Sequence, residues 1–202
     1  MSERWKQERR KDQFYRLAKE RGYRSRSAFK LLQAVRRYRF MKRGDKVVDL
    51  GAAPGGWLQV SRQVVGKEGF VLGIDMEPIS ELPWANVKAL VADIADESLD
   101  SVIIKHVGSK VDVVMSDVSP KISGAWDVDH ARQLYLAERS LEIAQAVLRR
   151  EGSFFVKVFH GSDLKAYRDR LVEHFEEVRF VKPPASKQRS SEIYVLATGY
   201  RG

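Results

Sequence analysis

The stretch that most constrains the fold is a short apolar run followed by a turn with almost no side-chain bulk. Residues 46–50 (KVVDL) are typical of a buried strand, residues 51–56 (GAAPGG) follow directly, and from Trp57 the apolar spacing becomes helical. Such a turn leaves backbone N–H groups beside a cleft, which suits a ligand that carries a nucleoside. The alternative is an ordinary strand-to-helix turn, but three glycines, two alanines and one proline in six residues exceed what that turn requires.

Acidic residues follow three of the expected strands. Asp75 lies 24 residues after Gly51 (75 − 51), a spacing at which an acid accepts hydrogen bonds from ribose hydroxyls in doubly wound folds. Asp93 follows the next strand, where it can accept from an adenine amino group or cap the helix expected over 99–107, and both interpretations stay open. Asp117 follows a further strand. Three acids at the carboxyl edge of one sheet indicate a site there.

The order of the expected elements predicts the fold class. Two βαβαβ units and one last strand without a covering helix give a doubly wound α/β sheet of about seven strands with helices on both faces. No linker or repeat divides residues 1–202, so we expect a single domain, with residues 1–26 as a basic N-terminal extension within it. The expected strands cover 46–50, 70–75, 87–91, 111–115, 152–159, 178–181 and 192–198, and the last long helices cover 129–149 and 164–175.

Two lysines stand out against apolar surroundings. Lys157 is the single charge in the strand 152–159, where a lysine is rarely buried without a partner or a purpose, so a functional role is favoured over a structural ion pair. Lys30 lies in a helix that Ser27 is expected to cap, and taken alone it would be a surface lysine. Residues 121–127 (KISGAWD) predict a mobile loop that exposes Trp126 as a stacking surface.

Composition limits the partners. The formal net charge is +9, from 36 lysines and arginines against 27 acids, which favours a polyanion: nucleic acid first and an acidic membrane surface second. There is no cysteine, which excludes disulfides and thiolate metal sites and suits a reducing cytoplasm. No apolar run approaches the roughly 20 residues that span a bilayer. We expect nucleic acid as the partner, no membrane partner and no metal site.

Basic charge gathers in two segments. The first 26 residues interleave arginines and lysines with aromatic side chains, a pattern that fits phosphate contacts and base stacking, although for residues 1–11 a solvated, frayed terminus fits equally well. The loop at 182–191 (KPPASKQRSS) is basic and rich in proline and serine, and it is suited to contacting phosphates. Both segments predict binding to RNA that weakens with salt.

Five stretches of the sequence are distinctive: RSRSAFKLLQ (24–33), VVDLGAAPGGW (47–57), MSDVSP (115–120), FFVKVFHG (154–161) and KPPASKQRSSEIYVLATG (182–199). Together they resemble one family, the FtsJ/RrmJ ribose 2'-O-methyltransferases that use S-adenosylmethionine. They span nearly the whole chain in the family's order, so the resemblance is highly specific. It implies a Rossmann-like methyltransferase fold with a mostly parallel sheet and an antiparallel last strand.

The resemblance also assigns roles to individual residues. The family's catalytic tetrad Lys-Asp-Lys-Glu falls on Lys30, Asp117, Lys157 and Glu192, called the tetrad below. Its cofactor residues fall on the glycine loop and on the acids after the strands, namely Gly51, Gly55, Gly56, Trp57, Asp75, Asp93 and Asp117. Where family members often have Asp-Met-Ser/Ala-Pro, this chain has Asp117-Val118-Ser119-Pro120.

The expected reaction is an in-line transfer of a methyl group from a sulfonium to a ribose hydroxyl. The sulfonium is already a good leaving group, so the protein must supply alignment and a stronger oxygen nucleophile. Lys157 is the candidate general base if its amine is neutral; if it is protonated, it steers the hydroxyl and stabilises the developing alkoxide. The sequence leaves both forms open.

The resemblance implies a uridine in the A-loop of large-subunit (23S-type) ribosomal RNA as the target, with the tRNA anticodon loop as the alternative. We expect a cytoplasmic monomer whose partner is RNA or the large ribosomal subunit. Two other classes compete: a dinucleotide oxidoreductase and a catalytically silent RNA-binding module. The loop GAAPGG departs from G-x-G-x-x-G, which disfavours the first, and the intact tetrad disfavours the second.

Overall fold

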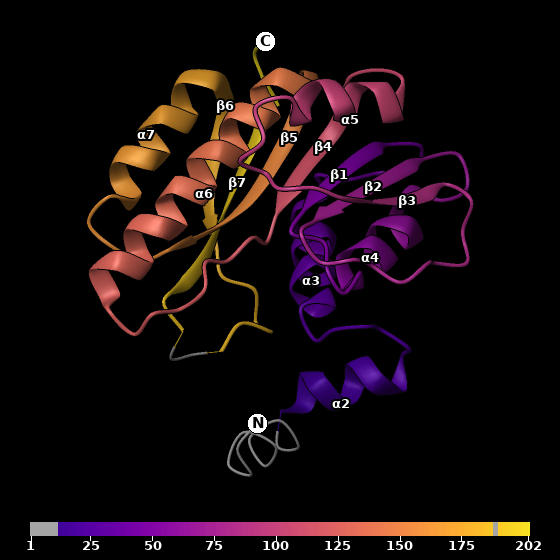
Figure 1. The fold of residues 1–202 in the computed structure, drawn as a ribbon, viewed down its shortest axis with the longest axis horizontal. Helices are drawn as coiled ribbons and strands as arrows, with labels where there is room; N and C mark the ends of the chain where they lie inside the picture. The colour runs from indigo at the N-terminus through magenta and orange to yellow at the C-terminus, as the bar shows by residue number, and fades with distance from the viewer. Residues whose placement is uncertain (1–11, 188–189) are drawn as a thin grey trace.

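A seven-stranded sheet forms the centre of the computed structural model, which describes residues 12–187 and 190–202 (Figure 1). The strands lie in the order β3-β2-β1-β4-β5-β7-β6. The described elements are α2 (Gln13–Glu20), α3 (Ala28–Tyr38), β1 (Lys46–Leu50), α4 (Gly56–Val65), β2 (Phe70–Asp75), β3 (Val87–Val91), α5 (Leu99–Val107), β4 (Val111–Ser116), α6 (Trp126–Val147), β5 (Leu148–Phe159), α7 (Leu164–His174), β6 (Phe175–Val181) and β7 (Glu192–Tyr200).

The sheet is parallel from β3 through to β5, and β7 is antiparallel to both of its neighbours. Strand order reverses at β1, because β2 and β3 lie on one side of it and β4 on the other. Open α/β sheets bind ligands outside the carboxyl ends of the strands at such a switch point. The predicted seven-stranded α/β sheet and its antiparallel last strand are confirmed.

The two faces of the sheet bury separate apolar clusters. Along β1, Val47 packs in one cluster and Val48 and Leu50 in the other, as the two-residue period of a strand requires. Buried residues of α3 and α4 complete the first cluster, and buried residues of α5, α6 and α7 complete the second. Helices therefore cover both faces of the sheet (Figure 1).

The structure differs from the predicted elements in several places. The first βαβαβ unit implies a helix between the second and third strands, and this is wrong: residues 76–86, all of them described, form a loop that contains Pro78 and Pro83, and β3 keeps an exposed face at the sheet edge. Helix α6 begins at Trp126 rather than Asp129, and β5 begins at Leu148 rather than Gly152. Ser27 does not cap α3 with its side chain; its hydroxyl lies 2.7 Å from the hydroxyl of Ser25 instead.

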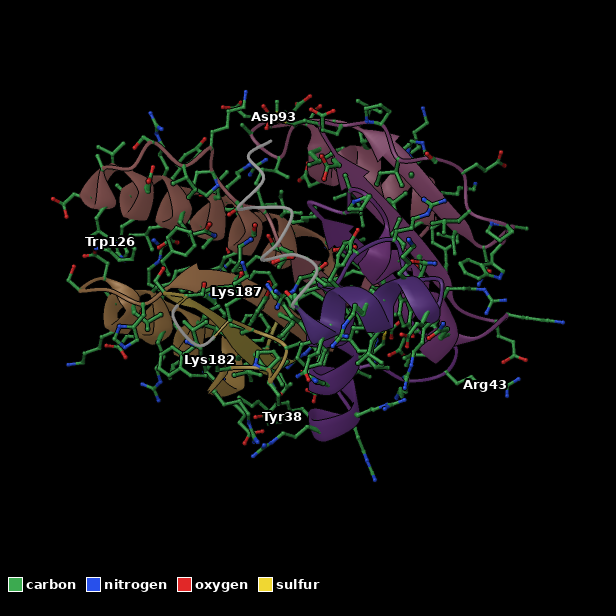
Figure 2. All side chains as sticks on the ribbon, turned by 90° about the horizontal axis from the view of Figure 1, so that it is seen from below. Tyr38, Arg43, Asp93, Trp126, Lys182 and Lys187 are labelled. Atoms are coloured by element: carbon green, nitrogen blue, oxygen red, sulfur yellow. The ribbon has the colours of Figure 1, made fainter. Side chains whose placement is uncertain are left out.

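Helix α2 and the loop between β6 and β7 flank the carboxyl edge, which Figure 2 views directly. The Arg26 guanidinium joins these segments, since it donates to the Asp12 carboxylate and to the Ala185 carbonyl. Residues 1–11 of the basic extension and residues 188–189 of the basic loop lie outside the described residues. The described parts of the two basic segments thus border the edge where the acids gather.

Candidate active site

The structure brings the four tetrad residues together from four separate elements. Lys30 on α3 donates from Nζ to Glu192 Oε1 at the start of β7, over 2.5 Å. Lys157 on β5 places Nζ 2.7 Å from the carbonyl oxygen and 3.1 Å from Oδ1 of Asp117, which follows β4. Residues separated by up to 162 positions therefore form two adjacent ion pairs at the carboxyl edge.

Tyr194 joins the two ion pairs into one network. Its hydroxyl donates to Asp117 Oδ1 over 2.8 Å and accepts from Lys30 Nζ over 3.3 Å. The sequence analysis missed this residue, although a signal was present: Tyr194 follows Glu192 by two positions in β7, so both side chains lie on the same face of the strand. Burial, and then the charge of Asp117, raises the pKa of Tyr194 well above its usual range, which keeps the hydroxyl protonated as a donor.

The network is buried but reaches solvent through its carboxylates. The side chains of Lys157 and Lys30 are 6% and 12% exposed, and those of Glu192 and Asp117 are 15% and 18% exposed. Two amines face two carboxylates, so the charges balance within the group when both amines are protonated. A charge-balanced cluster with one open side can receive a polar substrate group without leaving a buried ion unpaired.

Each form of the Lys157 amine keeps one site for a substrate. Its two contacts to Asp117 use two N–H donors. A neutral amine then offers its lone pair, and an ammonium offers its third N–H. Gln133, buried on α6, donates from Nε2 to the carbonyls of Val118 and Lys157 and so ties the end of β4 to β5. The backbone on both sides of the amine is fixed.

Trp57 supports the network from the core. Its indole is 3% exposed, stacks on Phe155 and lies tilted against Tyr194, with ring centroids 5.8 Å away in each case. Its Nε1 donates to the Ser27 carbonyl over 2.9 Å, which fixes the start of the helix that carries Lys30. The side chain of this predicted cofactor residue therefore packs against the tetrad's supports; its role toward a cofactor stays a prediction.

The loop that carries Glu192 is anchored to α3. The Ala185 N–H donates to Gln33 Oε1 over 2.8 Å, and the Ala185 carbonyl accepts from Arg26. Ser186, which is buried, contacts Glu192 Oε1 over 3.4 Å. The entry to β7 is thus held against the helix that supplies Lys30.

The glycine loop fits closely between its protein neighbours. Gly51 has φ +78°, and a Cβ there would lie 2.9 Å from Val118, the residue after Asp117. A Cβ on Gly56 would lie 2.2 Å from Ser25 Oγ, and one on Gly55 (φ +103°) would lie 3.0 Å from Arg24. The glycines thus let the loop approach the two segments that flank it, which the sequence analysis had attributed to approach by a ligand.

Arg24 fixes the glycine loop from outside. Its Nη1 donates to the carbonyls of Pro54 and Ser80 over 3.2 and 2.6 Å, and its Nη2 donates to the Glu81 carbonyl over 2.7 Å. The guanidinium therefore connects the loop after β1 to the loop after β2. Sequence reasoning missed this contact because the partners are backbone carbonyls, which have no sequence signature.

The predicted cofactor acids differ in environment. Asp75 accepts from the N–H groups of Ala53 and Glu77, so its carboxylate is oriented beside the glycine loop with lone pairs to spare. Asp93 is exposed and accepts from the Ala95 N–H over 2.9 Å, and the N-cap of α5 is Ser98 (Figure 2). Asp93 therefore orders its own turn and does not cap the helix.

Asp49 is a further acid that the sequence analysis did not single out. It is fully buried in β1, and neither carboxylate oxygen has a hydrogen-bond partner among the described residues. Burial raises its pKa well above the usual range, and the charges of Asp117 and Asp75 raise it further. The carboxyl groups of Asp49, Asp75 and Asp117 therefore interact electrostatically around the turn between β1 and α4.

This arrangement fits S-adenosylmethionine, whose sulfonium and ammonium are cationic. The neighbouring carboxyl groups, one of them without a hydrogen-bond partner, favour the binding of a cation and disfavour the binding of a dinucleotide, which carries a negative diphosphate. Asp75 offers an oriented acceptor for ribose hydroxyls. Among residues 12–187 and 190–202, no group of three or more His, Asp and Glu side chains is placed to hold a metal ion.

Within the same described ranges, the structure contains no helix long and apolar enough to cross a bilayer.

Comparison with known proteins agrees with this geometry. The model of the FtsJ-like methyltransferase family matches residues 23–200. The chain is 45% identical to the ribosomal RNA large subunit methyltransferase E of Methanocaldococcus jannaschii, over 98% of this chain and 82% of the relative. It is 41% identical to the protein of the same name from Methanothermobacter thermautotrophicus, over 100% of this chain and 96% of the relative.

Solved structures give the same assignment of the fold. A Plasmodium falciparum protein assigned as a ribosomal RNA methyltransferase superposes with a TM-score of 0.79 at 25% identity, over 89% of this chain and all of the other. Fibrillarin of Aeropyrum pernix, solved with bound S-adenosyl-L-methionine, gives a TM-score of 0.59 at 18% identity, over 87% of this chain and 75% of the other, which supports the fold alone. The chain therefore belongs to the FtsJ-like methyltransferase family, and its methyl donor is S-adenosylmethionine.

Proposed function

We propose that this protein methylates the 2'-oxygen of a ribose in RNA, and that its target is a uridine in the A-loop of large-subunit ribosomal RNA. The observation that carries the proposal is the connected network of Lys30, Glu192, Tyr194, Asp117 and Lys157 at the carboxyl edge of the sheet. The relatives named ribosomal RNA large subunit methyltransferase E support the choice of RNA class. The protein would act as a monomer in the cytoplasm.

In this proposal the tetrad aligns and activates the sugar oxygen. S-adenosylmethionine supplies an electrophilic methyl group on a sulfonium that leaves as a neutral thioether. Lys157 contacts the ribose 2'-hydroxyl with the position that Asp117 leaves free. A neutral amine takes the hydroxyl proton as a base, and an ammonium stabilises the developing alkoxide. Asp117 holds the Lys157 amine through two oxygens, and it also contacts Tyr194.

The second ion pair positions the substrate side of the network. Lys30 and Glu192 pair with one another beside Ser186, and both side chains stay partly exposed, so they would contact the ribose 3'-oxygen or a neighbouring phosphate. We assign Gly51, Gly55, Gly56, Trp57, Asp75, Asp93 and Asp117 to the cofactor side. The two groups meet at Asp117, which fits a site where donor and acceptor must be aligned within one pocket.

Product mapping tests the proposed function. The purified protein is incubated with labelled S-adenosylmethionine and with unmethylated large ribosomal subunits, the naked large-subunit RNA and unmodified tRNA in parallel, and 2'-O-methyl positions are mapped. The proposal expects one methylated uridine in the A-loop of the large-subunit RNA. Methylation only in a tRNA anticodon loop would move the target to the alternative class, and label on a base instead of a ribose would contradict the reaction.

A further inference from the structure

An exposed aromatic group borders the proposed active site. Trp126 is 50% exposed, and Ile122 (66%) and Val128 (43%) are exposed on the same segment. This segment, residues 118–128, is called the entrance loop below; it comprises the loop that follows Asp117 and the first residues of α6. Three exposed apolar side chains thus fall on the short segment that follows Asp117, and we ask what the largest of them, the Trp126 indole, could contact.

The indole is backed by a strand residue that belongs to the site. Trp126 stacks on Phe159 with ring centroids 6.1 Å apart and an interplanar angle of 20°. Phe159 lies opposite Glu192 in the pairing of β5 with β7 and follows Lys157 by two positions. Two strand residues span about 7 Å, so the indole lies on the order of 10 Å from the Lys157 backbone. A nucleotide that flanks a ribose held at the tetrad is within that reach.

The entrance loop is fixed in place by the start of α6. Asp129 is buried and accepts from the N–H and hydroxyl of Ser123, both over 2.8 Å, and from the Gly124 N–H over 3.1 Å. The backbone hydrogen bond from Ser123 lowers the pKa of Asp129, which keeps this anchor ionised. Behind Trp126, the His130 ring packs on Gly161, where a Cβ would lie 2.1 Å from Nε2. The aromatic face is therefore presented by a preorganised backbone.

The chemistry of the surface favours a nucleobase as the occupant. Lys121 and Asp127 are the charged residues of the entrance loop, both are exposed, and their opposite charges leave the segment with no net charge beside the Trp126 ring. Phosphates have a separate place: Lys182 and Lys187 are exposed on the basic loop beside the same edge (Figure 2). A flat neutral ring next to a cationic loop matches a strand whose bases stack and whose phosphates follow the cations.

We propose that Trp126, backed by Phe159, is a stacking platform for a base of the RNA strand that flanks the methylated ribose. This inference rests on the proposed function and adds a positioning residue to it. Stacking on an aromatic side chain accounts for roughly 5-fold to 100-fold in affinity per base. The platform acts on binding of the RNA, whereas the tetrad acts on the methyl transfer.

The test compares Trp126→Ala, Trp126→Phe and Tyr135→Ala with the wild type. Tyr135 is a matched control because it is 59% exposed on the same helix, nine residues and so half a turn around from Trp126. Two quantities are measured with unmethylated large-subunit ribosomal RNA: kcat and KM for methylation, and the equilibrium Kd of the RNA without cofactor. We expect Trp126→Ala to raise KM and Kd at least 5-fold with kcat within 2-fold, Trp126→Phe to stay near the wild type, and Tyr135→Ala to change neither.

Three outcomes would overturn the platform. They are a Trp126→Ala variant with wild-type KM and Kd, one that loses kcat alone, and one matched in its loss by Tyr135→Ala. If the wild-type protein does not methylate this RNA, the proposed function fails, and the comparison of Kd values alone decides whether Trp126 contacts a base.

Discussion

At the scale of single residues, the Tyr194 hydroxyl is the group whose removal should affect catalysis most clearly among the residues outside the tetrad. It contacts both ion pairs of the network, so Tyr194→Phe removes a link while the ring stays stacked on Phe155. A hydrogen bond to a charged group contributes about 1.5–3 kcal/mol, so kcat should fall roughly 10-fold to 100-fold while affinity for S-adenosylmethionine changes little.

The matched control is Tyr200→Phe, which removes another tyrosine hydroxyl on β7. That hydroxyl donates to the Gln145 carbonyl, on the opposite face of the sheet from the network. Steady-state kinetics and isothermal titration with the cofactor measure both variants. Equal losses of kcat in the two would show that the Tyr194 hydroxyl has only a general structural role.

Asp49 should make the stability of the cofactor-free protein depend on pH. Its pKa is raised on folding, so the folded state binds the proton more tightly than the unfolded chain does. The contribution of Asp49 to the free energy of unfolding is therefore fully present below about pH 4, where a carboxyl group in the unfolded chain is also protonated. It is lost as the pH rises toward the raised pKa of the folded state. Asp49→Asn removes this loss and should raise Tm at pH 7 without raising it at pH 4.

The comparison for Asp49→Asn is Glu97→Gln, which neutralises an exposed acid. Thermal unfolding is followed from pH 4 to pH 8 without cofactor. A Tm of Asp49→Asn that runs parallel to that of the wild type over this range would contradict a buried, unpartnered carboxyl group.

At the scale of elements, the glycine loop can be tested against a glycine in the same conformation elsewhere. Gly51 and Gly108 have φ of +78° and +76°, but a Cβ meets Val118 at the first and nothing within 4 Å at the second. Gly108→Ala should lower the free energy of unfolding only by the strain of a side chain at positive φ, roughly 1–2 kcal/mol. Gly51→Ala adds an overpacking term of about 1–3 kcal/mol and displaces the segment that carries Asp117.

Denaturant unfolding and cofactor titration measure this pair. The expected result is a larger loss of stability in Gly51→Ala and a loss of cofactor affinity in that variant alone. Similar free energies of unfolding and similar cofactor affinities in the two variants would mean that the close approach of the loop to Val118 has no energetic consequence.

The elements that sequence predicted best are those with local signals. The β-branched runs and the acids after them predicted the strands and the edge at which Asp75 and Asp117 lie. The tetrad was predicted through family resemblance, since no local pattern joins Lys30 to Glu192 across 162 positions. Arg24, Tyr194 and the buried position of Trp57 could not be predicted, because each depends on packing between segments distant in the sequence.

At the scale of the whole molecule, the net charge of +9 predicts that RNA binding weakens with salt. The logarithm of the binding constant should fall linearly with the logarithm of salt concentration, and Lys182→Ala with Lys187→Ala should lower the slope by about one to two. Lys67→Ala with Lys105→Ala is the matched pair, because both lysines are exposed and precede the amino ends of strands β2 and β4.

Filter binding of large-subunit ribosomal RNA at several salt concentrations measures these slopes. An unchanged slope in the first pair, or an equal change in both pairs, would remove the loop at 182–191 from the phosphate contacts.

The central claim is that the converged tetrad performs the methyl transfer, and single-turnover kinetics of Lys157→Ala tests it most directly. With saturating RNA and S-adenosylmethionine, the account predicts a methylation rate at least 10²-fold below the wild type, while cofactor Kd from isothermal titration stays within about 2-fold. A variant that methylates at a rate near the wild type would contradict the claim.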